Sequence, residues 1–225
     1  MINVKRLRGF VGALAILLPW LVVLLLGYFP TSISASYYLF ESGPVFMIIL
    51  GAASILLMCY SGYDKADDIL NTIIGIFGLG ICLFSCEPDE IMSSTEILQL
   101  THVGTFQIPV LVSKWLHNGF AVAFFVALAY MSFFQFTKTS GDMTKQKKIR
   151  NIIFKVCAAG MLASFLILLL PKFYIQVWLT ETFALFFFGV SWLTKSEVLP
   201  FLAADPKNKS TCTCNNNCGG NCTCK

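Results

Sequence analysis

The residues best placed to do chemistry are a histidine and a glutamate that lie inside long apolar stretches. His117 opens one such stretch, SKWLHNGFAVAFF, with Asn118 beside it, and Glu181 lies within YIQVWLTETFALFFFGV. Charge inside lipid is costly, so ionisable groups in apolar segments mark functional sites or tightly paired structural ones. As an acid–base pair or as metal ligands, His117 and Glu181 could serve an outer-leaflet lipid hydrolase or transferase. As a hydrogen-bonded pair, they would only fix the packing of helices, and both interpretations stay open.

Catalytic signatures are missing from the sequence. The chain has only two histidines, and it carries no H-E-x-x-H, G-x-S-x-G, Walker or dinucleotide-binding pattern. The sequence therefore favours a non-enzymatic function, as a membrane scaffold or sensor, over the hydrolase or transferase. A small solute or proton transporter is a third interpretation, because glycine-interrupted helices with a carboxyl group at depth would suit it.

A second group of reactive residues stands at the end of the chain, in TCTCNNNCGGNCTCK, which holds five of the nine cysteines. Two C-x-C pairs flank a central cysteine, and paired glycines allow a tight turn. Thiolates are ligands for Zn²⁺ and Cu(I), so the segment is a candidate metal site; the alternatives are a tail without a defined ligand, or lipidated or redox-sensing thiols. The candidate ligands are Cys212, Cys214, Cys218, Cys222 and Cys224.

The elements that must position these residues are membrane helices. The 225 residues are 56% hydrophobic and only 12% charged, and six stretches approach the roughly 20 apolar residues that cross a bilayer. The predicted fold is all-α: a polytopic six-transmembrane-helix bundle in residues 1–196, followed by a cytoplasmic tail, 197–225, whose Cys-rich end is expected to be disordered. The predicted helices cover about 10–28, 44–62, 69–86, 116–136, 152–170 and 174–194.

Basic residues predict the orientation of the helices, because positive charge favours the cytoplasmic side. In this topology fourteen of the sixteen Lys and Arg residues lie on one side, and only Lys114 and Lys172 lie on the other. Both termini are therefore predicted to be cytoplasmic, in a multi-pass protein of the cell membrane. Membrane lipids are the expected partners, and topology alone explains the basic loops without nucleic acid.

The same topology predicts an outward-facing polar pocket. Glu181 lies about 10 Å inside the last helix at 1.5 Å per residue, and His117 lies near the outer boundary of the hydrocarbon. The hydroxyl-rich loop TSISASYY places Tyr37 and Tyr38 in the same leaflet, where paired aromatics are also typical of an interfacial belt. The predicted pocket consists of Tyr37, Tyr38, His117, Asn118 and Glu181.

Two patterns predict how the helices pack. Glycines make the third helix thin, so we expect it to lie close against a neighbour; they are Gly75, Gly78 and Gly80. One face of the last helix collects Trp178, Glu181, Leu185, Phe188 and Trp192. Asp67 and Asp68 are expected to precede and cap a helix that starts at Ile69.

Several stretches together resemble an uncharacterised group of bacterial six-helix integral membrane proteins of unknown function. They are SISASYY, YSGYDKADD, LHNGFAVAFFVALAY, RNIIFKVC and ETFALFFFGVSWLTKS. The resemblance covers roughly residues 10 to 196 and leaves out the cysteine tail; in layout alone the chain is also similar to the DRAM-like six-helix proteins. It implies six helices and no particular activity, and it marks as positions to test Tyr37, Tyr38, Asp64, Asp68, His117 and Glu181.

Overall fold

The structure is a computed structural model that describes residues 4–60, 62, 64–88, 95–138 and 143–197. Its helices and strands are, in order, α1 (Val4–Leu26), α2 (Gly43–Met58), α3 (Lys65–Leu83), α4 (Thr95–Leu98), β1 (His102–Val103), β2 (Ile108–Pro109), α5 (Val110–Tyr130), α6 (Lys145–Ser164) and α7 (Gln176–Ser196). A 3₁₀ turn, Ser34–Tyr38, precedes α2; a π-helical turn, Met131–Gln135, continues α5; and a 3₁₀ turn, Phe165–Leu169, continues α6. The two short strands pair antiparallel, with Val103 opposite Ile108.

The predicted all-α class is confirmed, and the length and composition of the helices are compatible with a multi-pass membrane protein. Among the described residues, five helical stretches are long and apolar enough to cross a membrane: Lys5–Leu26, Lys65–Leu83, Val110–Gln135, Lys145–Leu169 and Gln176–Ser196. The remaining long helix, α2, has 16 residues. It is about 24 Å long, which is less than the roughly 30 Å of a hydrocarbon core.

Several helices begin earlier in the chain than predicted. α1 begins at Val4, α3 at Lys65, α5 at Val110 and α6 at Lys145. The prediction was wrong at these ends because it followed the apolar stretches alone. A helix continues past the hydrocarbon boundary wherever polar and charged residues can form its first turns, so hydropathy underestimates its length.

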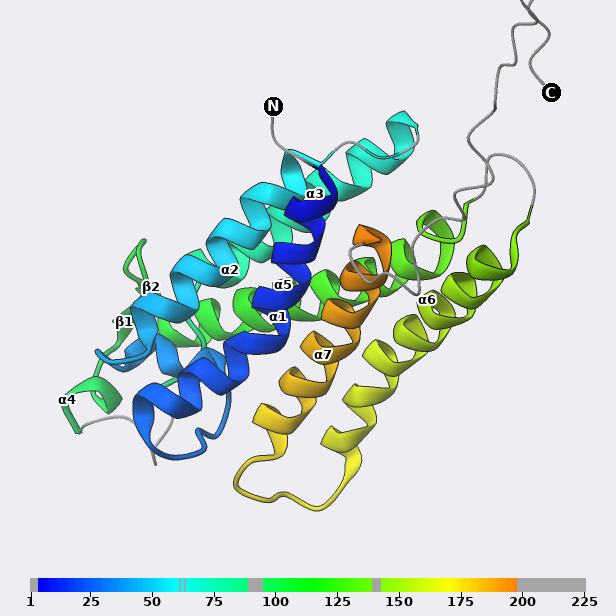
Figure 1. The fold of residues 1–225 in the computed structure, drawn as a ribbon. Helices are drawn as coiled ribbons and strands as arrows, with labels where there is room; N and C mark the ends of the chain where they lie inside the picture. Colours follow the sequence, from blue (N-terminus) through cyan, green and yellow to red (C-terminus); the bar gives the residue numbers. More distant parts are fainter. Residues whose placement is uncertain (1–3, 61, 63, 89–94, 139–142, 198–225) are drawn as a thin grey trace, which may run out of the picture.

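Helices that follow one another in the chain pack together, and α1 also packs against α7, so that the helices form a bundle (Figure 1). α2 packs on α3 and α3 on α5, while α7 lies between α1 and α6 and contacts both. The start of α1 and the end of α7 lie at the same end of the bundle, where Lys5 Nζ is 2.6 Å from Glu197 Oε2. We call this the terminal end, and the opposite end, where residues 31–38 lie, the distal end.

Glycines set the closest helix contacts, as the sequence predicts for α3. A Cβ on Gly75 would stand 2.6 Å from the carbonyl oxygen of Ser54, and one on Gly78 would stand 2.1 Å from the Ser54 hydroxyl, so α2 and α3 pack nearly backbone to backbone. α1 and α7 meet in the same way, because a Cβ on Gly189 would lie 2.6 Å from the carbonyl oxygen of Gly12. Such close approach is how helices associate where the solvent is as apolar as the side chains.

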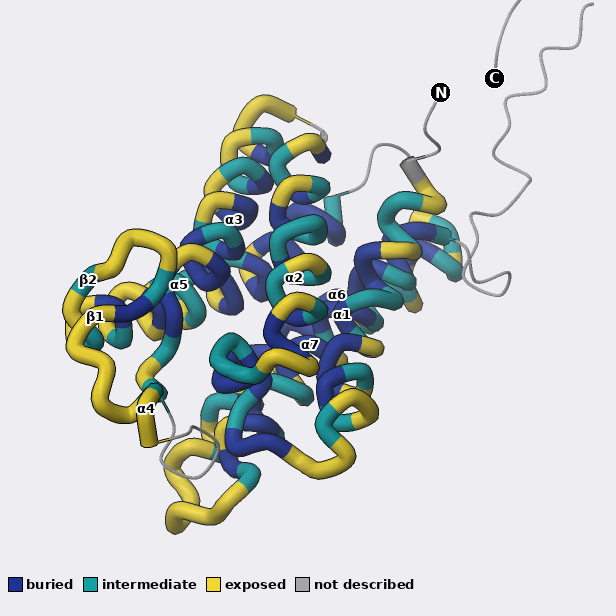
Figure 2. The backbone as a smooth tube through the Cα atoms, turned by 90° about the vertical axis from the view of Figure 1, so that its left-hand side faces the viewer, coloured by how far each residue is buried: buried dark blue, intermediate teal, exposed yellow. Residues whose placement is uncertain are grey.

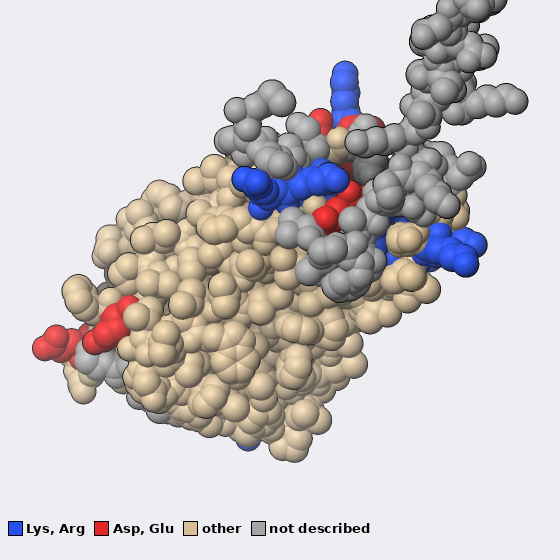
Figure 3. All heavy atoms as spheres, viewed as in Figure 1, with Lys and Arg blue, Asp and Glu red and all other residues tan. Residues whose placement is uncertain are grey.

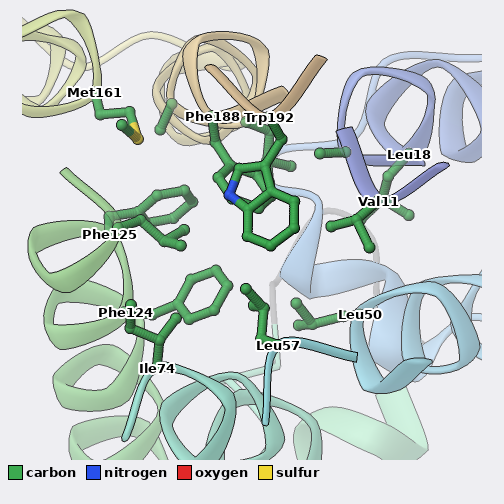
Figure 4. Packing of buried hydrophobic residues seen from close by; sticks show 14 of the residues in the cluster. Val11, Leu18, Leu50, Leu57, Ile74, Phe124, Phe125, Met161, Phe188 and Trp192 are labelled. Atoms are coloured by element: carbon green, nitrogen blue, oxygen red, sulfur yellow. The ribbon is translucent and has the colours of Figure 1, made fainter. Parts of the chain in front are cut away.

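Buried residues lie toward the centre of the bundle (Figure 2). Many of the exposed residues are large and apolar. Trp192 and Phe188 of α7 belong to the same buried cluster as Phe124 and Phe125 of α5 (Figure 4). The apolar residues that share one face of α7 are all buried: Trp178, Leu185, Phe188 and Trp192. Outward residues include Leu24, which is 76% exposed. An apolar exterior of this kind fits a lipid environment.

The start of α3 corrects the predicted role of its aspartates. Asp64, not Asp67 or Asp68, is the N-cap, and its carboxylate accepts from the backbone N–H of Asp67 at 3.0 Å. Asp67 is buried, and Lys138 Nζ lies 2.5 Å from its carboxylate and 2.9 Å from that of Asp64. Hydrogen bonding from Lys138 lowers the pKa of Asp64, and hydrogen bonds to Asp67 and Asp64 raise the pKa of Lys138. The cluster thus joins the start of α3 to the segment after α5.

Candidate functional site

Glu181 occupies the distal end of the bundle, in the second turn of α7. Its carboxylate accepts two hydrogen bonds from residues 31–38, which we call the distal segment. The backbone N–H of Ile33 donates to Oε2 at 2.5 Å, and the Ser34 hydroxyl donates to Oε1 at 2.9 Å. Glu181 therefore joins α7 to a segment about 147 positions earlier in the chain.

The distal segment is folded into the bundle rather than laid over its surface. Four consecutive residues, Ile33 to Ser36, are buried. The segment satisfies its own polar groups: the Ser32 hydroxyl accepts from the N–H of Ala35 at 2.9 Å, and the Ser36 hydroxyl donates to the carbonyl of Ile33 at 2.5 Å. The hydroxyl groups of this loop thus pair with backbone groups where the chain turns inside the protein.

Two further contacts fasten the same segment to its neighbours. The N–H of Trp178 donates to the carbonyl of Thr31 at 2.9 Å, beside the Glu181 contact. On the other side, the Tyr38 hydroxyl donates to the carbonyl of Cys86 at 2.5 Å and lies 3.0 Å from the Ser85 hydroxyl. Burial raises the pKa of Tyr38, so its hydroxyl stays protonated at neutral pH.

A small cavity lies beside Glu181. Its volume is about 40 Å³, and apolar side chains of α1, α2, α3, α5 and α7 line it together with Ser34 and Glu181. A water molecule needs roughly 10 to 15 Å³ of such space, so the cavity has room for two or three waters. A carboxylate offers about four acceptor positions, and the distal segment uses two of them. The arrangement can hold water, a small cation or a hydrogen-bond donor.

His117 belongs to a different contact. Its ring is buried on α5, and its Nδ1 lies 2.7 Å from the carbonyl oxygen of Phe84, just beyond the end of α3. Since a carbonyl oxygen only accepts, Nδ1 is the donor. His117 is not among the residues that line the cavity beside Glu181. The two residues that the sequence offers as an acid–base pair therefore have different partners.

The other residues of the predicted pocket also have different surroundings from one another. Tyr37 packs edge-on against Tyr38, with ring centroids 5.2 Å apart, while Asn118 is exposed. Two serines that the sequence did not single out take part in these contacts. Ser34 donates to Glu181, and the carbonyl of Ser85 accepts from the hydroxyl of Ser113 at 2.8 Å. The signal was present in the hydroxyl-rich loop, but only the fold shows which serine meets which group.

The cysteines proposed as metal ligands lie outside the described residues. Within the part of the chain that the structure describes, no group of three or more His, Cys, Asp or Glu side chains is placed to hold a metal ion. The metal prediction therefore depends on the sequence alone.

Comparisons of the chain with models of protein families, with curated proteins and with solved structures found no match. The site is therefore interpreted from its own geometry.

Proposed function

We propose that this chain is a non-enzymatic integral membrane protein, a scaffold or sensor, in which Glu181 latches the distal segment over a small cavity. The supporting observation is that both hydrogen bonds to the carboxylate come from that segment. A group that holds a closing segment through two short contacts is suited to switching between closed and open arrangements. Loss of both contacts would release the segment from α7.

The proposal includes a topology of six spans in the cell membrane, with both termini in the cytoplasm. α2 is antiparallel to α3 and packed on it, so we take α2 as the sixth span, completed by the residues that flank it. The visible Lys and Arg side chains gather mainly at the terminal end (Figure 3). That end then faces the cytoplasm, by the preference of basic residues for that side, and the distal end faces outward.

The geometry supports the scaffold or sensor more than the lipid hydrolase or transferase. A general base must come within hydrogen-bond reach of the group it activates, and a nucleophile needs such a base beside it. Here His117 is held by Phe84 and Glu181 by the distal segment. A cavity for two or three waters is also too small for the headgroup of a lipid.

A turnover assay tests this proposal. We expect the purified protein in proteoliposomes to leave fluorescent phospholipids and sphingolipids intact, with no difference from the variants His117→Ala and Glu181→Gln. Lipid turnover that is present in the unaltered protein and lost in His117→Ala would contradict the proposal and make the protein an enzyme. Uptake of a solute or of protons that depends on Glu181 would contradict it in favour of a transporter.

We further propose that the Cys-rich end binds Zn²⁺ or Cu(I) in the reducing cytoplasm, where stable disulfides are rare. The five cysteines after Ser210 provide more than the four thiolates of a tetrahedral zinc site. Metal analysis of protein purified under reducing conditions should find near-stoichiometric metal in the full chain and none in a chain ending at Ser210. Equal metal contents in the two chains would show that the tail is not the ligand.

A further inference from the structure

A second cavity lies at the terminal end. Its lining is mainly basic, whereas the lining of the cavity beside Glu181 is mainly apolar. It measures about 180 Å³ and lies between the ends of α1, α6 and α7. Five basic residues and one acidic residue contribute to its lining: Lys5, Arg8, Lys147, Arg150, Lys195 and Glu197. We call it the basic pocket.

The charges around the basic pocket do not balance. Glu197 is the one carboxylate in the described lining, and it is already shared between Lys5, at 2.6 Å, and Arg150. Lys147 and Lys195 are both buried, at 9% and 8% exposure. Cations withdrawn from water are unfavourable unless an anion compensates them, so the excess of positive charge calls for a bound anion.

The surrounding structure holds these cations in place. The guanidinium of Arg8 stands 4.7 Å above the ring of Tyr60, and the ammonium of Lys195 stands 5.0 Å from the centre of the Phe136 ring. Lys147 Nζ donates to the carbonyl of Phe136 at 3.1 Å. Cation–π and backbone contacts therefore fix the geometry of the pocket before any ligand arrives.

Two buried donors in the pocket are unused within the described part of the chain. The Nε atoms of Arg8 and Arg150 are both buried and have no hydrogen-bond partner there. Buried donors in native proteins are nearly always paired, and an unpaired one is unfavourable. Both arginines line the basic pocket, and an anion that has several oxygens could pair with donors of both guanidinium groups.

We propose that the basic pocket binds a phosphate group, carried either by the headgroup of an anionic lipid or by free phosphate. Arginine matches phosphate through parallel N–H donors, and lysine adds charge. A lipid could reach the pocket, because α6 carries exposed apolar residues close in sequence to the pocket lining. Ile149 and Ile152 are 51% and 62% exposed. Basic pockets between helices at the cytoplasmic surface suit such headgroups.

The test uses the full chain in nanodiscs, with thermal unfolding followed by tryptophan fluorescence. In one arm, inorganic phosphate is titrated into discs of neutral phosphatidylcholine, with chloride at equal ionic strength as the reference. In the other arm, phosphatidic acid or a phosphatidylinositol phosphate is added to the discs without free phosphate. We expect stabilisation in at least one arm, and the arm that responds identifies the source of the phosphate.

Variants connect the effect to the pocket. Arg8→Gln should weaken the apparent affinity about tenfold, because a charge-assisted hydrogen bond contributes at least that much. Lys148→Gln is the control: Lys148 follows Lys147 on α6 but is exposed and outside the lining, so this variant should leave the stabilisation unchanged. If Arg8→Gln does not fold, Lys147→Gln replaces it. No stabilisation in either arm, or equal stabilisation of the pocket variants and the unaltered protein, would overturn the proposal.

Discussion

Replacing Glu181 with leucine is expected to destabilise the folded protein by about 2 to 4 kcal/mol, because two donors of the distal segment lose their acceptor. The N–H of Ile33 is the more affected, since Ile33 is only 2% exposed and its contact with Glu181 is 2.5 Å long. The Ser34 hydroxyl can turn to another acceptor more easily than a backbone N–H can. Thermal unfolding of the purified variant in detergent measures the effect.

Glu181→Gln is the matched control for this substitution. Its amide oxygen can still accept from Ile33, while its NH₂ group cannot accept from the Ser34 hydroxyl. We therefore expect most of the stability to remain. A leucine variant as stable as the unaltered protein would refute the latch. If glutamine were as harmful as leucine, the negative charge rather than the hydrogen bonding would be the important property of Glu181.

The second large effect is expected at the contact of α1 with α7. Gly189→Ala should destabilise the protein by about 1 to 3 kcal/mol, as overpacking usually does. The added Cβ would lie 2.6 Å from the carbonyl oxygen of Gly12 and 2.5 Å from Cγ1 of Ile16. The Ile16 side chain can turn away, but the backbone oxygen moves only if α1 itself shifts. Thermal unfolding in detergent again measures the change.

Gly51→Ala is the control for that variant, because nothing lies within 4 Å of the Cβ that it adds to α2. Alanine favours helix over glycine by up to about 1 kcal/mol, so this variant should be neutral or slightly stabilised. Equal behaviour of the two alanine variants would show that α1 and α7 do not approach each other as closely as described here.

Much of the architecture could be predicted from the sequence because lipid imposes simple rules. Long apolar stretches must be helical, and glycines at short spacing indicate a close neighbour, as Gly75 and Gly78 confirm against Ser54. The large apolar residues of α7 that share one face by helical spacing are buried. These features are local properties of the chain, so a single sequence contains them.

The candidate site could be predicted only in part, because sequence indicates depth but not which helices are neighbours. The sequence predicts Glu181 and His117 in the same leaflet, yet the first contacts Ser34 and the second contacts Phe84. The ion pair of Asp67 with Lys138 joins residues 71 positions apart, and no local sequence pattern indicates it. The hydropathy of the distal segment also predicts an exposed loop, although Ser36 is fully buried.

The most direct test of the latch is the accessibility of the distal segment from outside the cell, the side that the proposed topology assigns to the distal end. In a chain with its nine cysteines replaced, Ala35→Cys and Phe40→Cys would each be treated on intact cells with a membrane-impermeant maleimide. Ala35 is 5% exposed and Phe40 is 92% exposed, so Phe40→Cys serves as the control that should always react.

We predict that Ala35→Cys stays unlabelled while Glu181 is present and becomes labelled when Glu181→Leu is added. Equal labelling of Ala35→Cys with and without Glu181 would contradict the latch. Failure of Phe40→Cys to react would contradict the outward orientation of the distal end.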